Sequence, residues 1–188
     1  MSGIGDPLRA SAVVNLSNAV VMVVDDEPFS LALTVQSLSG FGAQIKFVSD
    51  NAAEALQVLE HNVVDLIVVD CEMPEMDGYD LVKSLRAARK EPNSYIPVIM
   101  TAAHVKKSKV LKARDCGANF MVTKPFSPST LLERIVWVAR DNRPFLQAGN
   151  YFGPDRRFRD EGAPATGERR WNGSPSPSQA VAEAGAET

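Results

Sequence analysis

Residues 66–78 read Leu-Ile-Val-Val-Asp-Cys-Glu-Met-Pro-Glu-Met-Asp-Gly and form the most informative stretch of this 188-residue chain. The apolar run at its start is continuous rather than alternating, which is typical of a strand buried on both faces of a sheet. The run ends at Asp70, and a helical pattern built on Tyr79, Leu81 and Leu85 begins at Gly78. A buried strand followed by an amphipathic helix is the unit from which parallel α/β sheets are built.

The same unit recurs before and after this stretch. Helix signals follow every apolar strand, including Pro28 in a first turn, Asn51 as an N-cap, and Ser127 or Ser129 before the last helix. Five strand–helix units in series predict a five-stranded parallel sheet with five helices on both faces. The predicted strands are residues 20–24, 44–48, 66–69, 97–100 and 119–123.

The composition limits the classes of function. The net charge of -3 and the isoelectric point near 5.4 argue against DNA binding, because DNA-binding proteins usually have a basic domain or a basic face. Two cysteines, Cys71 and Cys116, are too few for a disulfide framework. No signal peptide is evident, and the longest apolar run, 19–24, is far too short to cross a membrane. We therefore expect a cytoplasmic protein without membrane insertion.

Polar side chains stand where the predicted strands end. Asp25 and Asp26 end the first strand, Asp70 the third, Thr101 the fourth and Lys124 the fifth. Ligand sites of open α/β sheets lie at this edge, so these side chains should converge. Crowded carboxylates suit a hard cation such as Mg²⁺, and a carboxylate is also a nucleophile for phosphoryl transfer. The hydroxyl and the ammonium could then bind the transferred phosphoryl oxygens.

Each of these residues also has a purely structural explanation. Asp25 and Asp26 could cap the helix that Pro28 opens, and Asp70 could be a turn residue after a buried strand. Thr101 and Lys124 taken alone carry little information. Their joint occurrence at the strand ends favours a phosphoryl-accepting site.

Four segments carry a resemblance to a known family. They are V-V-D-D-E-P at 23–28, V-V-D-C-E-M-P-E-M-D-G at 68–78, V-I-M-T-A at 98–102 and T-K-P-F at 123–126. Together they resemble the receiver domains of two-component response regulators, over residues 19–140. The resemblance implies a flavodoxin-like fold with strand order 2-1-3-4-5. It also implies a histidine kinase or phosphotransferase as partner.

The resemblance assigns roles to the strand-end residues. Asp70 corresponds to the phosphoacceptor, and Asp25 and Asp26 to an acidic pair that binds Mg²⁺ together with Asp70 and the backbone carbonyl of Glu72. The two remaining residues correspond to the switch hydroxyl, Thr101, and the phosphoryl-binding lysine, Lys124. The bond from Lys124 to Pro125 is expected to be cis.

Two positions depart from the family pattern. Receivers usually carry Tyr or Phe three residues before the lysine, where this chain has Met121. Phe120 is adjacent but should point to the opposite face of its strand. Cys71 beside the phosphoacceptor is also unusual, and we interpret it as a small buried thiol rather than a redox sensor.

Residues 141–188 have a different composition, because Leu146 and Val181 are their only Ile, Leu or Val residues, and their six basic residues are all Arg. We therefore predict three parts: a flexible extension (residues 1–18), the receiver (19–140) and a tail (141–188) that stays disordered unless a ligand binds it.

The tail contains a duplicated acid-Arg-Arg-aromatic unit, offset by 13 residues. The units are Asp155, Arg156, Arg157 and Phe158, and Glu168, Arg169, Arg170 and Trp171.

The duplicated unit suits a ligand with repeated guanines. Arg binds guanine O6 and N7 bidentately, an acid can accept from the guanine amino edge, and aromatic rings stack on bases. Cyclic di-GMP fits this description. The tail resembles that of the CheY-like cyclic-di-GMP effectors (Cle group) over roughly residues 143–171. The alternative is a solvated linker whose acids and arginines pair with one another.

These observations predict a stand-alone response regulator that is not an enzyme. It would accept a phosphoryl group on Asp70, bind cyclic di-GMP through the tail and act on a protein partner such as the flagellar motor switch. One alternative is a phosphorelay shuttle without second-messenger binding. Another is a Mg²⁺-dependent phosphohydrolase, for which the chain is short and lacks a second set of substrate-binding residues.

Overall fold

The computed structural model describes residues 16–156, and every structural statement below concerns this part of the chain. It consists of alternating strands and helices with a hairpin at the end. The elements are β1 (Val20–Val24), α1 (Pro28–Gly40), β2 (Gln44–Ser49), α2 (Ala52–His61), β3 (Leu66–Asp70), α3 (Gly78–Ala87), the 3-10 helix η2 (Asn93–Tyr95), β4 (Val98–Ala102), α4 (Lys107–Cys116), β5 (Phe120–Thr123), α5 (Pro128–Ala139), β6 (Phe145–Ala148) and β7 (Tyr151–Pro154).

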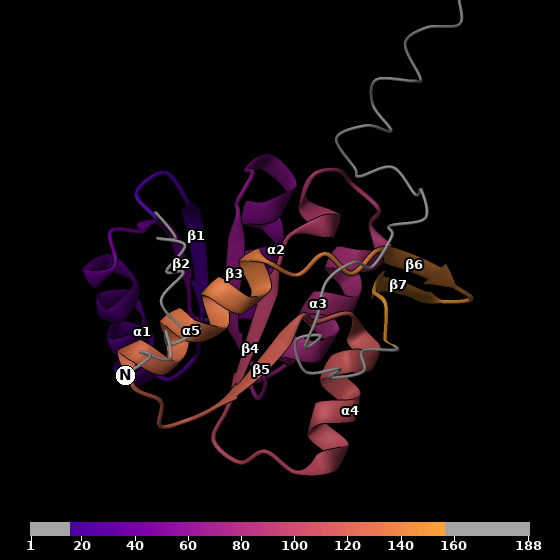
Figure 1. Cartoon of the computed structure of the whole chain (residues 1–188). Helices are drawn as coiled ribbons and strands as arrows, with labels where there is room; N and C mark the ends of the chain where they lie inside the picture. The colour runs from indigo at the N-terminus through magenta and orange to yellow at the C-terminus, as the bar shows by residue number, and fades with distance from the viewer. Residues whose placement is uncertain (1–15, 157–188) are drawn as a thin grey trace, which may run out of the picture. The chain divides into compact units, whose positions relative to one another are not determined.

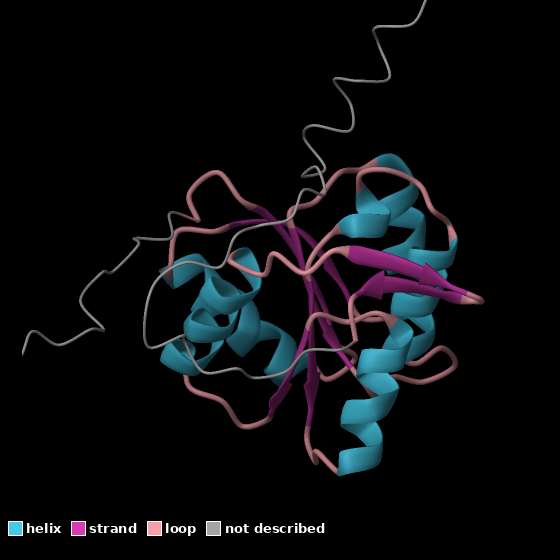
Figure 2. Ribbon diagram, turned by 45° about the vertical axis from the view of Figure 1, so that its right-hand side comes forward, coloured by secondary structure: helices cyan, strands magenta, loops and turns pink. Residues whose placement is uncertain are grey.

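The central sheet has five parallel strands in the order β2-β1-β3-β4-β5, as predicted. Helices α1 and α5 cover one face, and α2, α3 and α4 cover the other (Figures 1 and 2). The register places Asp70 at the end of β3 directly beside Thr101 of β4. The predicted convergence of these two side chains therefore follows from the strand pairing.

The helix boundaries follow from capping groups that the sequence provides. The Glu27 carboxylate caps α1 by accepting from the backbone N–H groups of Phe29 (3.1 Å) and Ser30 (2.6 Å). Asn51 caps α2, and Ser127 rather than Ser129 caps α5. These caps fix the direction in which each helix leaves the edge of the sheet where the polar residues gather.

Two apolar layers hold the helices to the sheet. Residues of β1, β3 and β4 alternate between the layers, since successive strand residues point to opposite faces. The same alternation separates Phe120 from Met121 on β5, as predicted. Phe120 packs against Trp137 of α5, with ring centroids 5.1 Å apart, whereas Met121 packs on the layer beneath α3 and α4.

The structure differs from the prediction at both ends of the receiver. Leu16, predicted to lie in a flexible extension, is buried in the layer beneath α1 and α5. Residues 145–154, predicted to belong to a disordered tail, form the antiparallel hairpin β6–β7. A two-residue turn joins its strands, and Gly149 in that turn has φ of 57°, a conformation typical of hairpin turns with Gly.

Aromatic residues explain why the hairpin is folded. Phe145 and Phe152 pack on Tyr95 of η2, each with its ring centroid 5.1 Å from that of the tyrosine. The low content of Ile, Leu and Val predicted disorder for these residues, but aromatic side chains provide the buried apolar surface instead. The hairpin also approaches the end of α4, where a Cβ on Gly153 would lie 2.8 Å from the Cα of Gly117. It is thus an integral part of the α3 and α4 side of the domain (Figure 1).

Candidate functional site

Four of the predicted site residues meet at the carboxyl edge of the sheet. The Lys124 ammonium lies 2.6 Å from Asp25 Oδ2 and 2.5 Å from Asp70 Oδ1, so it bridges two carboxylates from different strands. Thr101 Oγ1 lies 3.4 Å from the same Asp70 oxygen. We call Asp25, Asp70, Thr101 and Lys124 the acidic cluster.

Burial dominates the electrostatics of the acidic cluster. Asp70 is only 6% exposed and Asp25 3% exposed. Burial raises the pKa of Asp70, and this effect, assisted by the charge of Asp25, outweighs the hydrogen bonds from Lys124 and Glu72 that lower it. Burial lowers the pKa of Lys124, but its bonds to Asp25 and Asp70 outweigh burial and leave that pKa raised. One ammonium therefore compensates the two crowded carboxylates incompletely.

The loop after β3 cradles the Asp70 side chain. The backbone N–H of Glu72 donates to Asp70 Oδ2 at 2.6 Å, which orients the carboxylate. Gly78 at the start of α3 packs on the Asp70 backbone so closely that a Cβ there would lie 1.9 Å from the Asp70 carbonyl oxygen. The Asp-Gly pair at 77–78 therefore combines an N-cap for α3 with a position that has no room for a side chain.

Asp25 is oriented by the start of α1. The Ser30 hydroxyl donates to Asp25 Oδ2 at 2.6 Å, and the backbone N–H of Glu27 donates to Asp25 Oδ1 at 3.1 Å. Sequence reasoning did not identify Ser30. Its position five residues after Asp25, in the first turn of a helix that Pro28 opens, is the signal that could have revealed it.

The predicted Mg²⁺ ligands meet only in part. Asp25 and Asp70 converge, whereas Asp26 does not join them in the contact with Lys124. Within residues 16–156, no three Asp, Glu, His or Cys side chains form a group that could hold a metal ion by themselves. Mg²⁺ normally takes one or two carboxylates plus waters and phosphate oxygens, however. Two buried, incompletely compensated carboxylates fit that ligand set.

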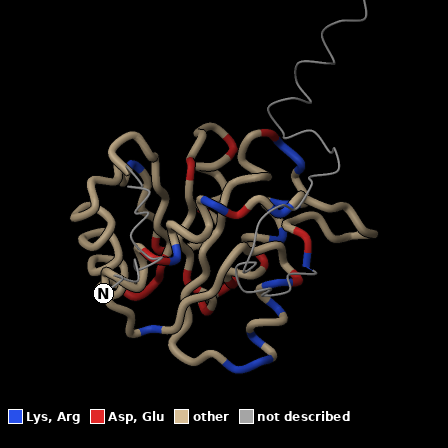
Figure 3. Tube along the Cα trace, viewed as in Figure 1, with Lys and Arg blue, Asp and Glu red and all other residues tan. Residues whose placement is uncertain are grey.

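Helix α4 is connected to the cradle by two ion pairs. Lys109 Nζ lies 2.7 Å from the Glu72 carboxylate, and Lys112 Nζ lies 2.8 Å from Asp77. Basic residues recur along α4 (Figure 3), and Ala113 and Cys116 are its only buried residues. These ion pairs connect α4 to the loop that holds Asp70, while Ala113 and Cys116 provide its buried apolar contacts.

Cys71 lies next to Asp70 but is fully buried. Burial raises the pKa of its thiol to about 12, and that of Cys116 to about 11. Since the thiolate is the reactive form, both cysteines are unreactive near neutral pH. This agrees with the interpretation of Cys71 as a small buried thiol.

Only the first two predicted nucleotide-binding residues, Asp155 and Arg156, lie within the part of the chain that the structure describes. Arg156 Nη1 lies 3.2 Å from Asp115 of α4, and the Asp155 N–H donates to the Pro144 carbonyl at 2.9 Å. The remaining six lie outside the described residues. They are Arg157, Phe158, Glu168, Arg169, Arg170 and Trp171.

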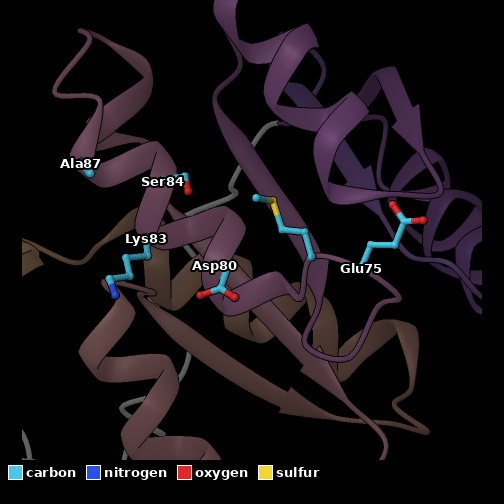
Figure 4. A pocket seen from close by; sticks show the side chains of 6 residues that line it. Glu75, Asp80, Lys83, Ser84 and Ala87 are labelled. Atoms are coloured by element: carbon cyan, nitrogen blue, oxygen red, sulfur yellow. The ribbon is translucent and has the colours of Figure 1, made fainter.

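An open groove of about 420 Å³ runs beside α3 (Figure 4). None of the predicted site residues lines this groove, so it adds nothing to the acidic cluster. Its lining residues are Glu75, Met76, Asp80, Lys83, Ser84 and Ala87.

The fold and the acidic cluster define a flavodoxin-like α/β protein with an acidic site at the carboxyl edge of its sheet. Residues 21–136 match the model of the response regulator receiver domain. Because this match covers more than half of the chain, the chain belongs to the response regulator receiver family.

Relatives and solved structures agree with this assignment. Chemotaxis protein CheY-3 of Vibrio cholerae is 32% identical over 124 residues, which cover 66% of this chain and 93% of the relative. Chemotaxis protein CheY1 of Helicobacter pylori is 32% identical over 123 residues, or 65% of this chain and 98% of the relative. The structure of Vibrio cholerae CheY4 superposes with a TM-score of 0.60 at 28% identity, covering 64% of this chain and 98% of that chain. The chain is therefore a CheY-like response regulator receiver with additional residues.

No helix within residues 16–156 is long and apolar enough to span a membrane.

Proposed function

We propose that this protein accepts a phosphoryl group on Asp70 from a phosphohistidine in a histidine kinase or phosphotransferase. The observation that carries the proposal is the Lys124 ammonium, which touches both Asp70 and Asp25. An Asp70 oxygen attacks phosphorus, a P–O bond forms, and the P–N bond to the donor imidazole breaks. Lys124 then pairs with one phosphoryl oxygen, and the Thr101 hydroxyl can donate to another.

A divalent cation suits the same residues. Asp25, Asp26, Asp70 and the Glu72 backbone carbonyl are the groups that would hold Mg²⁺. When bound, the ion would neutralise charge on the phosphoryl oxygens. Ser30 would keep Asp25 oriented toward it through the 2.6 Å hydrogen bond.

Helix α1 offers a surface for the phosphoryl donor beside the acidic cluster. It contains no charged residue, and it exposes Phe29 (69%) and Leu33 (47%) on one stripe. Its first turn is linked to the cluster through the bond from Ser30 to Asp25. A protein that brings phosphohistidine to Asp70 must cover this edge, and an apolar helix face is a suitable contact for it.

We expect Phe29→Ser to slow phosphoryl transfer from a phosphorylated histidine protein by about tenfold, because burying a Phe contributes about 1.5–3 kcal/mol. Phosphorylation by acetyl phosphate should not change, since this small donor needs no docking surface. Transfer rates from both donors test this. The matched control is Val63→Ser. The Val63 side chain is also exposed (59%), but it precedes β3 and so lies toward the amino ends of the strands, away from the acidic cluster. Equal slowing with both donors would contradict docking through α1.

We further propose that the Arg-rich tail binds cyclic di-GMP as a second input. The duplicated acid-Arg-Arg-aromatic unit supports this, because each unit has the groups that recognise a guanine edge and face. The output would pass to a protein partner such as the flagellar motor switch. The chemotaxis function named for the relatives supports a partner of this kind. The proposed role is signalling rather than turnover of a small substrate.

Calorimetric titration of the full chain with cyclic di-GMP tests the second input. We expect binding in the micromolar range or tighter, with Arg156→Ala and Arg169→Ala each weakening it by about tenfold, since a bidentate Arg–guanine contact contributes about 1–3 kcal/mol. Arg134→Ala on α5 is the control for loss of one positive charge. No heat at tens of micromolar ligand would exclude the binding. Unchanged affinity in both tail variants would exclude the two-unit recognition.

The alternative of a phosphorelay shuttle is favoured by one observation. Met121 occupies the position of the usual aromatic switch, yet the acidic cluster itself is assembled. A shuttle needs the phosphoryl chemistry without a relay to an output face. It would pass the phosphoryl group on to a second histidine protein and would bind no nucleotide.

A further inference from the structure

The first arginine of the duplicated acid-Arg-Arg-aromatic units, Arg156, is held on the receiver. The Arg156 guanidinium carbon lies 3.4 Å from the centroid of the Tyr151 ring, so it is in stacking contact with that ring. Its Nη1 donates to Asp115 Oδ1 at 3.2 Å, and the same carboxylate oxygen accepts from Arg114. The structure thus brings two guanidinium groups to the C-terminal end of α4.

The ring beneath Arg156 is rigid. Tyr151 is buried, and its hydroxyl donates to the Pro154 carbonyl at 2.6 Å. Gly153 packs against Gly117. A Cβ atom on either glycine would collide with neighbouring atoms, so the hairpin lies directly on the receiver. The ring is therefore fixed to the body of the receiver before any ligand binds.

The outer side of Arg156 is available for a ligand. Its side chain is 36% exposed although it is in contact with the tyrosine ring. Its Nε is buried and has no hydrogen-bond partner within residues 16–156. A planar cation stacked on a fixed aromatic ring is a surface on which a nucleobase can stack.

We propose that Tyr151, Arg156 and Arg114 form a base-stacking site for an anionic guanine nucleotide on the receiver itself. This inference rests on the proposed binding of cyclic di-GMP. It adds that Arg156 is one half of a site whose other half is the hairpin and α4.

Each residue has a distinct role in this site. The base stacks on the exposed face of the Arg156 guanidinium, which in turn is supported by Tyr151. Asp115 fixes the orientation of that guanidinium, since its carboxylate accepts from Arg156. Arg114 adds a second positive charge next to Arg156, which suits the phosphates of the ligand.

Titration of the full chain with cyclic di-GMP tests the composite site. Tyr151→Leu removes the ring and should weaken binding about tenfold, as base stacking contributes about 1–3 kcal/mol, whereas Tyr151→Phe keeps the ring and should bind nearly as the wild type. Arg114→Ala should weaken binding at least threefold. Arg114 is 47% exposed on α4, so its replacement tests the site even if Tyr151→Leu disturbs the hairpin. Arg134→Ala, another arginine over an aromatic ring, is the matched control.

The outcomes separate this inference from the proposed function. Wild-type binding that persists unchanged in Tyr151→Leu and Arg114→Ala would overturn the composite site and leave tail binding intact. Absence of binding by the wild type at tens of micromolar would overturn both. Loss in Tyr151→Leu and Arg114→Ala, with retention in Tyr151→Phe and Arg134→Ala, supports the composite site.

Discussion

Asp70→Asn is expected to abolish phosphoryl acceptance, with a loss of more than about 100-fold in acyl-phosphate formation. The amide keeps the size of the carboxylate but is not a nucleophile for phosphorus. Lys124 would still pair with Asp25, so the fold around the site should persist. Because the change removes the reacting atom itself, we expect the largest functional effect in the chain.

Two measurements check this expectation. Acetyl phosphate with Mg²⁺ should phosphorylate the wild type and leave Asp70→Asn unmodified on an acid-quenched gel. Beryllofluoride with Mg²⁺ should shift the amide resonances of residues 70–78 and 101–103 only in the wild type. Asp50→Asn, a change at an exposed aspartate, is the matched control. Phosphorylation that survives Asp70→Asn would mean that another side chain is the acceptor.

Much of this site could be predicted because its residues stand at the ends of consecutive strands. Parallel strands bring their carboxyl ends to one edge, so the position of Asp70 in the sequence already placed it near Thr101 and Lys124. Strand order was not derivable from the residues, because periodicity does not say which strands are neighbours. It came from the resemblance to receivers, and the structure confirms it.

Contacts that depend on three-dimensional proximity could not be predicted. The role of Gly78 is to leave room for the Asp70 backbone, and a glycine in sequence does not reveal what lies against it. Ser30 is one of several serines at helix starts, and only the structure shows that it donates to Asp25. The hairpin was missed for another reason, since its stability comes from Phe145 and Phe152 packing on the receiver rather than from its own aliphatic content.

A buried arginine beneath this hairpin holds several segments together. Arg86 of α3 is 1% exposed, and its guanidinium lies 5.1 Å from the centroid of the Phe145 ring. It donates to the carbonyls of Ser94 (2.7 Å), Ile96 (2.7 Å) and Gly117 (3.1 Å). Burial lowers its pKa to about 10, which still leaves it charged at neutral pH. One side chain therefore joins α3, the loop before β4 and the end of α4.

Arg86→Met should lower the free energy of unfolding by about 3–5 kcal/mol, the largest effect on stability that we expect from a single change. Methionine fills much of the volume but donates no hydrogen bond, so three buried carbonyls lose a donor at about 1–3 kcal/mol each. Urea denaturation of the full chain measures the loss. Arg89→Met is the matched control, because Arg89 is exposed, and we expect a cost below about 1 kcal/mol there. A similar small cost for Arg86→Met would show that water replaces its bonds and that the hairpin does not depend on this residue.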